Sequence, residues 1–205
     1  MELLTILLRM AVHFRTRVEP LAHCAIGLAA LSLVPLLGLA AAAENETLEN
    51  TVKAAYLAKF GLYVDWPTTA FAAPSSVFNL CIAGEDPFGA TLDKAVAEQR
   101  VGNRPIVVVR LKTVGRDSGC HILYLGGSDR LTAQILAAAR SSGVLSVGDA
   151  RGPATPAAII NFVIKDNRVR FDIDEEAAAQ NGLTISSKLL NLALNVKRKK
   201  SEETR

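Results

Sequence analysis

The residues that could carry out chemistry in this chain are few and scattered. Three histidines occur, and His121, beside Cys120 in an apolar segment typical of a strand, is the one that follows residue 43. A lone histidine in such a segment usually belongs to the core. Catalysis or zinc binding needs further histidines, cysteines or carboxylates at defined spacings. We therefore predict no catalytic residue, no metal site and no cofactor.

Two further patterns favour structural roles. Gly84 and Gly89 have part of the spacing of a phosphate-binding loop, but the residues that follow include no lysine where that loop requires one. Ser187 stands next to Lys188, and serine at this place favours a helix N-cap over a catalytic pair. A hydrolase that uses Ser187, Lys188 or His121 is therefore the least favoured function.

The first 43 residues have the layout of an export signal. Arginines come first, and an uncharged run from Ala25 to Ala43 ends in small residues. Pro35 and Gly38 are expected to break a helix just before an Ala-x-Ala cleavage site, and no basic cluster follows the run. We predict a signal peptide over residues 1–43, cleaved near Ala43, so that the protein acts in the periplasm. A retained transmembrane anchor is the alternative, because the run is long enough to span a bilayer.

Composition narrows the function classes. Half of the residues are apolar, which fits a globular protein and argues against disorder. A net charge of +3 with no long basic stripe gives no reason to expect nucleic acid as a partner. After residue 43 the cysteines are Cys81 and Cys120, and export favours a disulfide between them. Two buried free thiols are the alternative.

The periodicity of apolar residues predicts alternating helices and strands. Helices are expected over 46–63, 90–98, 128–140, 175–180 and 186–196, and strands over 77–83, 106–111, 120–125, 144–147, 157–164 and 169–173. Asp166 and Asn167 are placed for a tight hairpin turn. The pattern predicts one three-layer α/β/α domain over residues 44–196 with a mixed sheet, followed by a charged tail over 197–205.

Several short segments occur together in a fixed order over about residues 50–196. They include Lys53-Ala-Ala-Tyr56, Trp66-Pro67, Asp86-Pro-Phe-Gly89, Val147-Gly-Asp149, Ile160-Asn-Phe162 and Val169-Arg-Phe-Asp172. Together these segments resemble the YfiR family of periplasmic proteins. The resemblance implies a regulator, not an enzyme, that represses a membrane-bound diguanylate cyclase by binding its periplasmic sensor region. It also implies a homodimer and a structural Cys81–Cys120 disulfide. A second disulfide of the family has no counterpart here, because Val144–Pro156 contains no cysteine.

Four residues are candidates for binding a partner or a small ligand. Phe60 and Phe162 could form an apolar patch or belong to the core, and Trp66, at a helix exit, could lie at a surface. Arg170 could hold a ligand carboxylate or form an ion pair with Asp172, its neighbour on the same strand face, and the ion pair is favoured. A periplasmic small-ligand binding protein in another pathway is the alternative function.

Overall fold

The structure is a computed structural model that describes residues 34–115, 118–127, 129–138, 143–149 and 158–198. The chain forms two compact units, Met1–Glu46 and Thr47–Arg205. Of the predicted signal peptide, residues 1–33 lie outside the described residues, and helix α3 (Val34–Phe60) begins within the remainder. Among the described helices, none combines the length and the apolar character that crossing a membrane requires.

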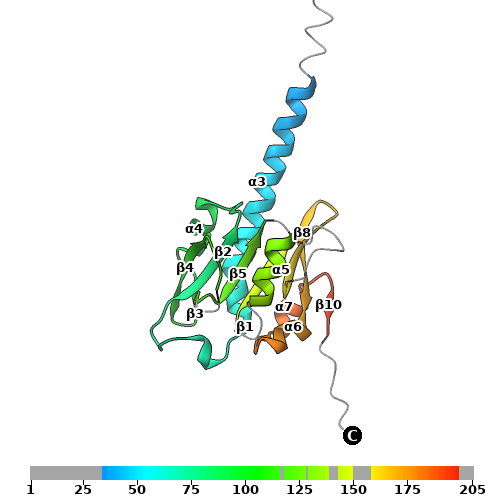
Figure 1. The fold of residues 1–205 in the computed structure, drawn as a ribbon. Helices are drawn as coiled ribbons and strands as arrows, with labels where there is room; N and C mark the ends of the chain where they lie inside the picture. Colours follow the sequence, from blue (N-terminus) through cyan, green and yellow to red (C-terminus); the bar gives the residue numbers. More distant parts are fainter. Residues whose placement is uncertain (1–33, 116–117, 128, 139–142, 150–157, 199–205) are drawn as a thin grey trace, which may run out of the picture. The chain divides into compact units, whose positions relative to one another are not determined.

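The second unit is built on an eight-stranded sheet with the order β10-β8-β7-β6-β5-β2-β4-β3 (Figure 1). Strands β4, β2, β5, β6 and β7 are parallel to their neighbours in this series, whereas β8 is antiparallel to β7 and β3 to β4. The strands are β2 (Phe78–Gly84), β3 (Arg100–Val101), β4 (Arg104–Leu111), β5 (Ile122–Gly126), β6 (Leu145–Asp149), β7 (Ile160–Lys165), β8 (Arg168–Asp174) and β10 (Val196–Lys197). The predicted α/β domain with a mixed sheet is confirmed.

The remaining elements connect these strands or precede them. The helices are α3, α4 (Ala90–Val96), α5 (Asp129–Ala138), α6 (Glu175–Gln180) and α7 (Ser187–Leu190), with short 3-10 turns η1 (Gly61–Tyr63) and η2 (Thr68–Ala70). Strands β1 (Val64–Asp65) and β9 (Thr184–Ile185) pair antiparallel in a separate two-stranded sheet. The predicted helix over 46–63 thus ends in a 3-10 turn, and the extended exit before Pro67 forms β1.

Side chains of the central strands divide between two core clusters. On β2, Phe78, Leu80 and Ile82 join a cluster that also contains residues of α3, whereas Cys81 and Ala83 join a second one with Ile135 of α5. Successive side chains on a strand point to opposite faces of the sheet. Because both faces of β2 are buried, its sequence is apolar except for Asn79, as expected for a parallel strand covered by helices.

Local sequence signals account for most element ends. Asp166 and Asn167 have φ values of +50° and +56° and connect β7 to β8, which confirms the predicted hairpin turn. Asp174 accepts a hydrogen bond from the backbone N–H of Ala177 and caps α6. Ser186 caps α7 in the same way through Leu189.

The C-terminal region differs from the prediction. The helix expected over 186–196 ends at Leu190, and the chain then returns to the sheet as β10. Lys197, predicted to begin a solvated tail, pairs through its Nζ with Asp174 and Glu176 at 2.9 and 3.1 Å. Apolar residues continue past the helix because this returning segment also packs on the domain. Their spacing alone does not distinguish a longer helix from a short helix followed by a strand.

Candidate functional site

Phe60 and Phe162, two of the predicted binding residues, lie in the core. Each side chain is 1 % exposed, and their rings stack at 5.9 Å between centroids. Phe171 contacts the ring of Phe60 edge-on at 5.4 Å, and Tyr56 of α3 lies against the same group. These aromatics fix α3 onto strands β7 and β8, so neither Phe60 nor Phe162 presents a surface to a partner in this structure.

Trp66 belongs to a different aromatic group. It is half-buried just after β1, and its ring meets that of Phe78 edge-on at 5.0 Å. The indole Nε1 is buried and makes no hydrogen bond within the described residues. A buried donor without a hydrogen-bond partner lowers the stability of the folded domain. The Nε1–H group of Trp66 is such a donor.

Arg170 lies on β8 opposite Val163 of β7 and is half-buried. Its expected partner Asp172 instead accepts hydrogen bonds from the backbone and the side chain of Asn195, at 3.1 and 2.9 Å. The ion pair favoured from the sequence is therefore not among those of the described residues. Since Phe171 enters the core and Arg170 points to the other face, the structure does not bring the four predicted residues together at one site.

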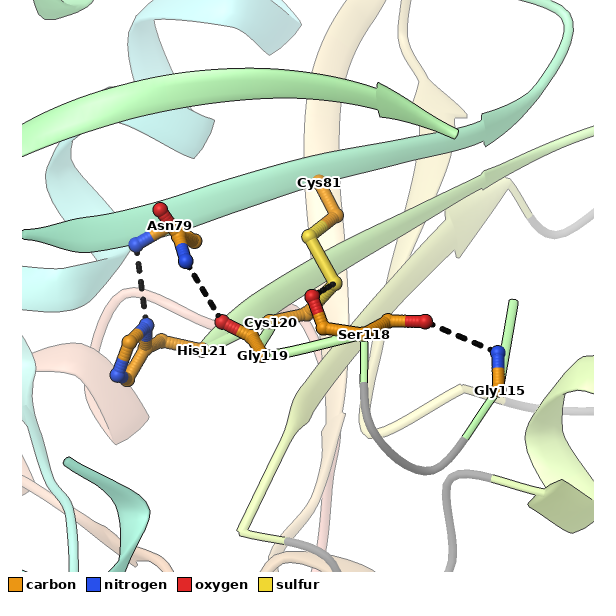
Figure 2. Close-up of a disulfide and its surroundings, with 7 residues drawn as sticks. All are labelled: Asn79, Cys81, Gly115, Ser118, Gly119, Cys120 and His121. Atoms are coloured by element: carbon orange, nitrogen blue, oxygen red, sulfur yellow. Dashed lines mark hydrogen bonds between the residues drawn. A yellow bond between two sulfur atoms is a disulfide. The ribbon is translucent and has the colours of Figure 1, made fainter. Parts of the chain in front are cut away.

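Cys81 and Cys120 form a disulfide with a Cα–Cα distance of 5.7 Å (Figure 2). Cys81 is fully buried on β2, and Cys120 lies at the entry to β5, the neighbouring strand. The side-chain amide of Asn79 also donates a hydrogen bond to the carbonyl of Gly119 at 2.8 Å. The disulfide and this hydrogen bond together hold the segment before β5 against β2.

His121, which follows the disulfide, is held on several sides. Its Nδ1 accepts a hydrogen bond from the backbone N–H of Asn79 at 3.0 Å (Figure 2). The rings of Phe71 and Phe78 stack on it at 4.7 and 4.8 Å. Burial lowers the pKa of His121, and the charge of Arg104 lowers it further, against the opposing effect of the Ala70 carbonyl. The interpretation of His121 as a core residue agrees with this geometry.

Arg104 completes this group, and sequence reasoning missed its role. Its guanidinium lies 3.9 Å from the centroid of the Phe71 ring and donates hydrogen bonds to the carbonyl of Ala73 and to both oxygens of Ser76. One arginine thereby fixes the irregular segment between η2 and β2. We define Trp66, Phe71, Phe78, Arg104 and His121 as the aromatic column.

A second charged group lies where β5 and β6 end. Lys53 of α3 is 6 % exposed, and its Nζ lies 2.6 Å from a carboxylate oxygen of both Glu49 and Asp149. The hydroxyl of Tyr124 donates to the other oxygen of Asp149 at 2.8 Å. Buried ions are tolerated when they are paired and hydrogen-bonded. The four-residue spacing of Glu49 and Lys53 was visible in the sequence, but the distant partner Asp149 was not.

At the ends of β2 and β4, Arg110 binds two aspartates. Its Nε lies 2.6 Å from Asp86, and its guanidinium donates two hydrogen bonds of 3.0 Å to Asp93. Asp86 also accepts the backbone N–H groups of Phe88 and Gly89. Burial alone would raise the pKa of Asp86, but these hydrogen bonds outweigh burial and lower it. The backbone N–H groups of the Gly84–Gly89 turn are thus bound by the chain's own Asp86 carboxylate, in the place where a phosphate would bind.

Metal binding finds no support in the described part of the chain, where no three side chains of histidine, cysteine, aspartate or glutamate come together as ligands. Comparison with known proteins supplies the family. Residues 50–194 match a family model described as YfiR/HmsC-like. No curated protein matches the chain.

Proposed function

Because the chain belongs to the YfiR/HmsC-like family, whose model matches residues 50–194, we propose that it is a periplasmic regulator that represses a membrane-bound diguanylate cyclase. It does so by binding the periplasmic sensor region of the cyclase. The match extends over nearly the whole unit Thr47–Arg205, and this is the observation that carries the proposal.

The geometry of the charged groups supports binding over catalysis. Lys53, Asp149 and Tyr124 bind one another, and Arg110 binds Asp86 and Asp93. Side chains that hold each other in this way stabilise the ends of the strands. In parallel α/β domains these strand ends are where substrates bind, so their use as structural contacts favours a binding protein.

Repression would operate through conformational populations. A sensor region that samples active and inactive forms shifts toward the inactive form when a partner binds that form more tightly. The regulator needs no chemistry of its own in this scheme. It needs a surface that fits one form of the sensor, together with a signal that weakens the fit.

Of the four residues predicted to bind, Trp66 and Arg170 keep part of their side chains accessible. We propose that these two contact the sensor, whereas Phe60 and Phe162 support the strands beneath. The guanidinium of Arg170 has no ion-pair partner among the described residues, which leaves it available for a carboxylate of the partner.

Deleting the gene and measuring cyclic di-GMP tests the role. We expect the level to rise after deletion, and to fall again on complementation with the wild-type chain but less with Trp66→Ala or Arg170→Gln. Arg168→Gln is the matched control, because Arg168 is an exposed arginine on the same strand and the same strand face. An unchanged cyclic di-GMP level in the deletion strain would refute repression. Equal complementation by all variants would refute the proposed contacts.

A further inference from the structure

The ring of His121 joins two parts of the chain that are distant in sequence, residues 71–79 and the start of β5. It is 5 % exposed and lies between the rings of Phe71, which follows η2, and Phe78, which begins β2. The backbone N–H of Asn79 donates to its Nδ1, and Figure 2 shows this bond beside the Asn79–Gly119 hydrogen bond. His121 is therefore a contact on which the packing of 71–79 against the start of β5 depends.

The hydrogen bond to Nδ1 defines the protonation state of the His121 ring. Because Nδ1 accepts from Asn79, it carries no proton, and the ring is neutral with its hydrogen on Nε2. Nε2 is buried and makes no hydrogen bond of good geometry within the described residues. A proton added to Nδ1 would face the N–H of Asn79, so protonation removes the hydrogen bond and sets two donors against each other.

Among the described residues, no carboxylate compensates the charge that protonation of His121 would create. The groups that Asn79 of β2 and Phe71 after η2 present to the ring are neutral, and the Ala70 carbonyl, which favours the protonated ring, carries no full charge. Arg104 of β4, with its guanidinium over the Phe71 ring, is the charged group near His121 in the described part of the chain. A protonated His121 would thus be a buried cation near a second cation, which is unfavourable on both counts.

We propose that His121 is an acid-sensitive latch that keeps the segment from Trp66 to Asn79 packed on the domain. When His121 is protonated, the bond to Asn79 breaks and the aromatic column opens, and with it the packing of Trp66 on Phe78. Since we assign Trp66 to the contact with the cyclase sensor, opening weakens that contact and releases the cyclase in acid. This regulatory consequence rests on the proposed function, whereas the latch itself does not.

The direction of the pH effect follows from linkage. A histidine whose pKa is lower in the folded state than its value of 6.5 in the unfolded chain binds protons better when unfolded. The stabilisation it provides is complete above that value and is lost as the pH falls from 6.5 toward the folded-state pKa. Within that window the equilibrium constant for unfolding rises by up to about tenfold per pH unit.

The first experiment uses the purified exported protein, in which His121 is the histidine beyond residue 43. We expect NMR titration to give a pKa below 6.5 for His121. Urea denaturation between pH 7.5 and 5.5 compares wild type with His121→Asn, which keeps an acceptor near the position of Nδ1 but does not titrate in this range. The wild type should lose stability toward acid relative to the variant. A pKa at or above the ordinary value, or parallel pH profiles, would overturn the latch.

Hydrogen exchange adds a local measurement that a general loss of stability would not reproduce. The protection factor of the Asn79 amide should fall between pH 7 and pH 5.5, while that of Ile82, in the middle of β2, falls less. In His121→Asn the two amides should change in parallel. Equal loss at both amides in the wild type would argue that no latch opens locally.

The cellular experiment tests the regulatory consequence. Cells with the wild-type chain should raise cyclic di-GMP after a shift of the medium to pH 5.5, and cells with His121→Asn should respond less. A deletion strain with unchanged cyclic di-GMP would refute the proposed function and leave the latch to be judged by the denaturation and exchange measurements. A deletion effect together with an equal acid response in both strains would refute regulation through His121.

Discussion

At the scale of single residues, the ion group around Lys53 shows how a buried charge is accommodated. The ammonium is shared by Glu49, one turn earlier on α3, and by Asp149 at the end of β6. Tyr124 binds the second oxygen of Asp149, and the Phe162 ring lies 5.8 Å from the ammonium. The contact therefore fixes both the position and the rotation of α3 on the sheet.

Replacing Lys53 by Met should destabilise the domain strongly. The change removes the cation and leaves the Asp149 carboxylate, 17 % exposed, with Tyr124 as its neutral donor. Breaking a buried pair in this way costs about 3 kcal/mol. Urea denaturation measures the loss, and Lys59→Met, which removes an exposed lysine from the same helix, is the control. Equal stability of the two variants would show that the ion group contributes little.

At the scale of elements, the backbones of β2 and β5 come so close at Gly84 and Gly126 that neither position has room for a side chain. A Cβ on Gly84 would overlap the carbonyl oxygen of Gly126, and one on Gly126 would overlap the carbonyl oxygen of Glu85. The N–H of Glu85 donates to the Gly126 carbonyl at 3.2 Å. Glycine at both positions lets β2 and β5 stay paired to their ends, next to Asp86 and its partner Arg110.

Gly126→Ala should therefore cost stability, whereas Gly148→Ala, on the adjoining strand β6 and opposite Leu125, should not. The added methyl at Gly126 meets backbone, which cannot move aside, and such overpacking typically costs about 1–3 kcal/mol. A methyl at Gly148 would find the Cβ of Ala158 at 3.7 Å, an ordinary contact. Thermal unfolding of both variants measures the difference, and similar melting temperatures would contradict the close approach.

At the scale of the whole molecule, the disulfide and the predicted export signal point to the same compartment. The bridge closes a loop of 39 residues between neighbouring strands, which stabilises the domain by about 4 kcal/mol in the chain-entropy model. That stabilisation is available only in an oxidising compartment, and the periplasm of the family is such a compartment. A homodimer stays a prediction that the mass of the protein in solution will decide.

Mass spectrometry of the exported protein tests both features at once. The mass should correspond to a chain that begins near Glu44 and lacks two hydrogens, and reductant should restore them. A version without residues 1–43 should stay in the cytosol with free thiols. An intact N-terminus on the exported protein would instead favour the retained anchor.

The order of the elements followed from the sequence for most of the domain. Val77–Ala83 predicted β2, and Asp166 with Asn167 predicted the hairpin between β7 and β8, because apolar runs and turn residues act over a few neighbouring positions. The short strands β3, β9 and β10 were missed. Each pairs over two residues, which is too short for a periodic pattern.

The sites were less predictable than the elements. Phe60 and Trp66 are six residues apart in sequence but contact different aromatic groups, because the 3-10 turn and β1 separate them. Arg170 does not pair with Asp172, because Asp172 accepts hydrogen bonds from Asn195 of the C-terminal segment. Contacts of this kind depend on residues that are distant in the chain. No local sequence pattern therefore predicts which residue becomes the partner.

By itself, the sequence determined the α/β class, the hairpin and the family, since these depend on local spacing and on motifs in a fixed order. Only the tertiary structure decided that Lys53 forms an ion pair with Asp149, that Arg104 lies over the ring of Phe71 and that His121 accepts a hydrogen bond from the backbone N–H of Asn79. These contacts join residues from 33 to 96 positions apart, and the packing of the sheet and its helices places them side by side.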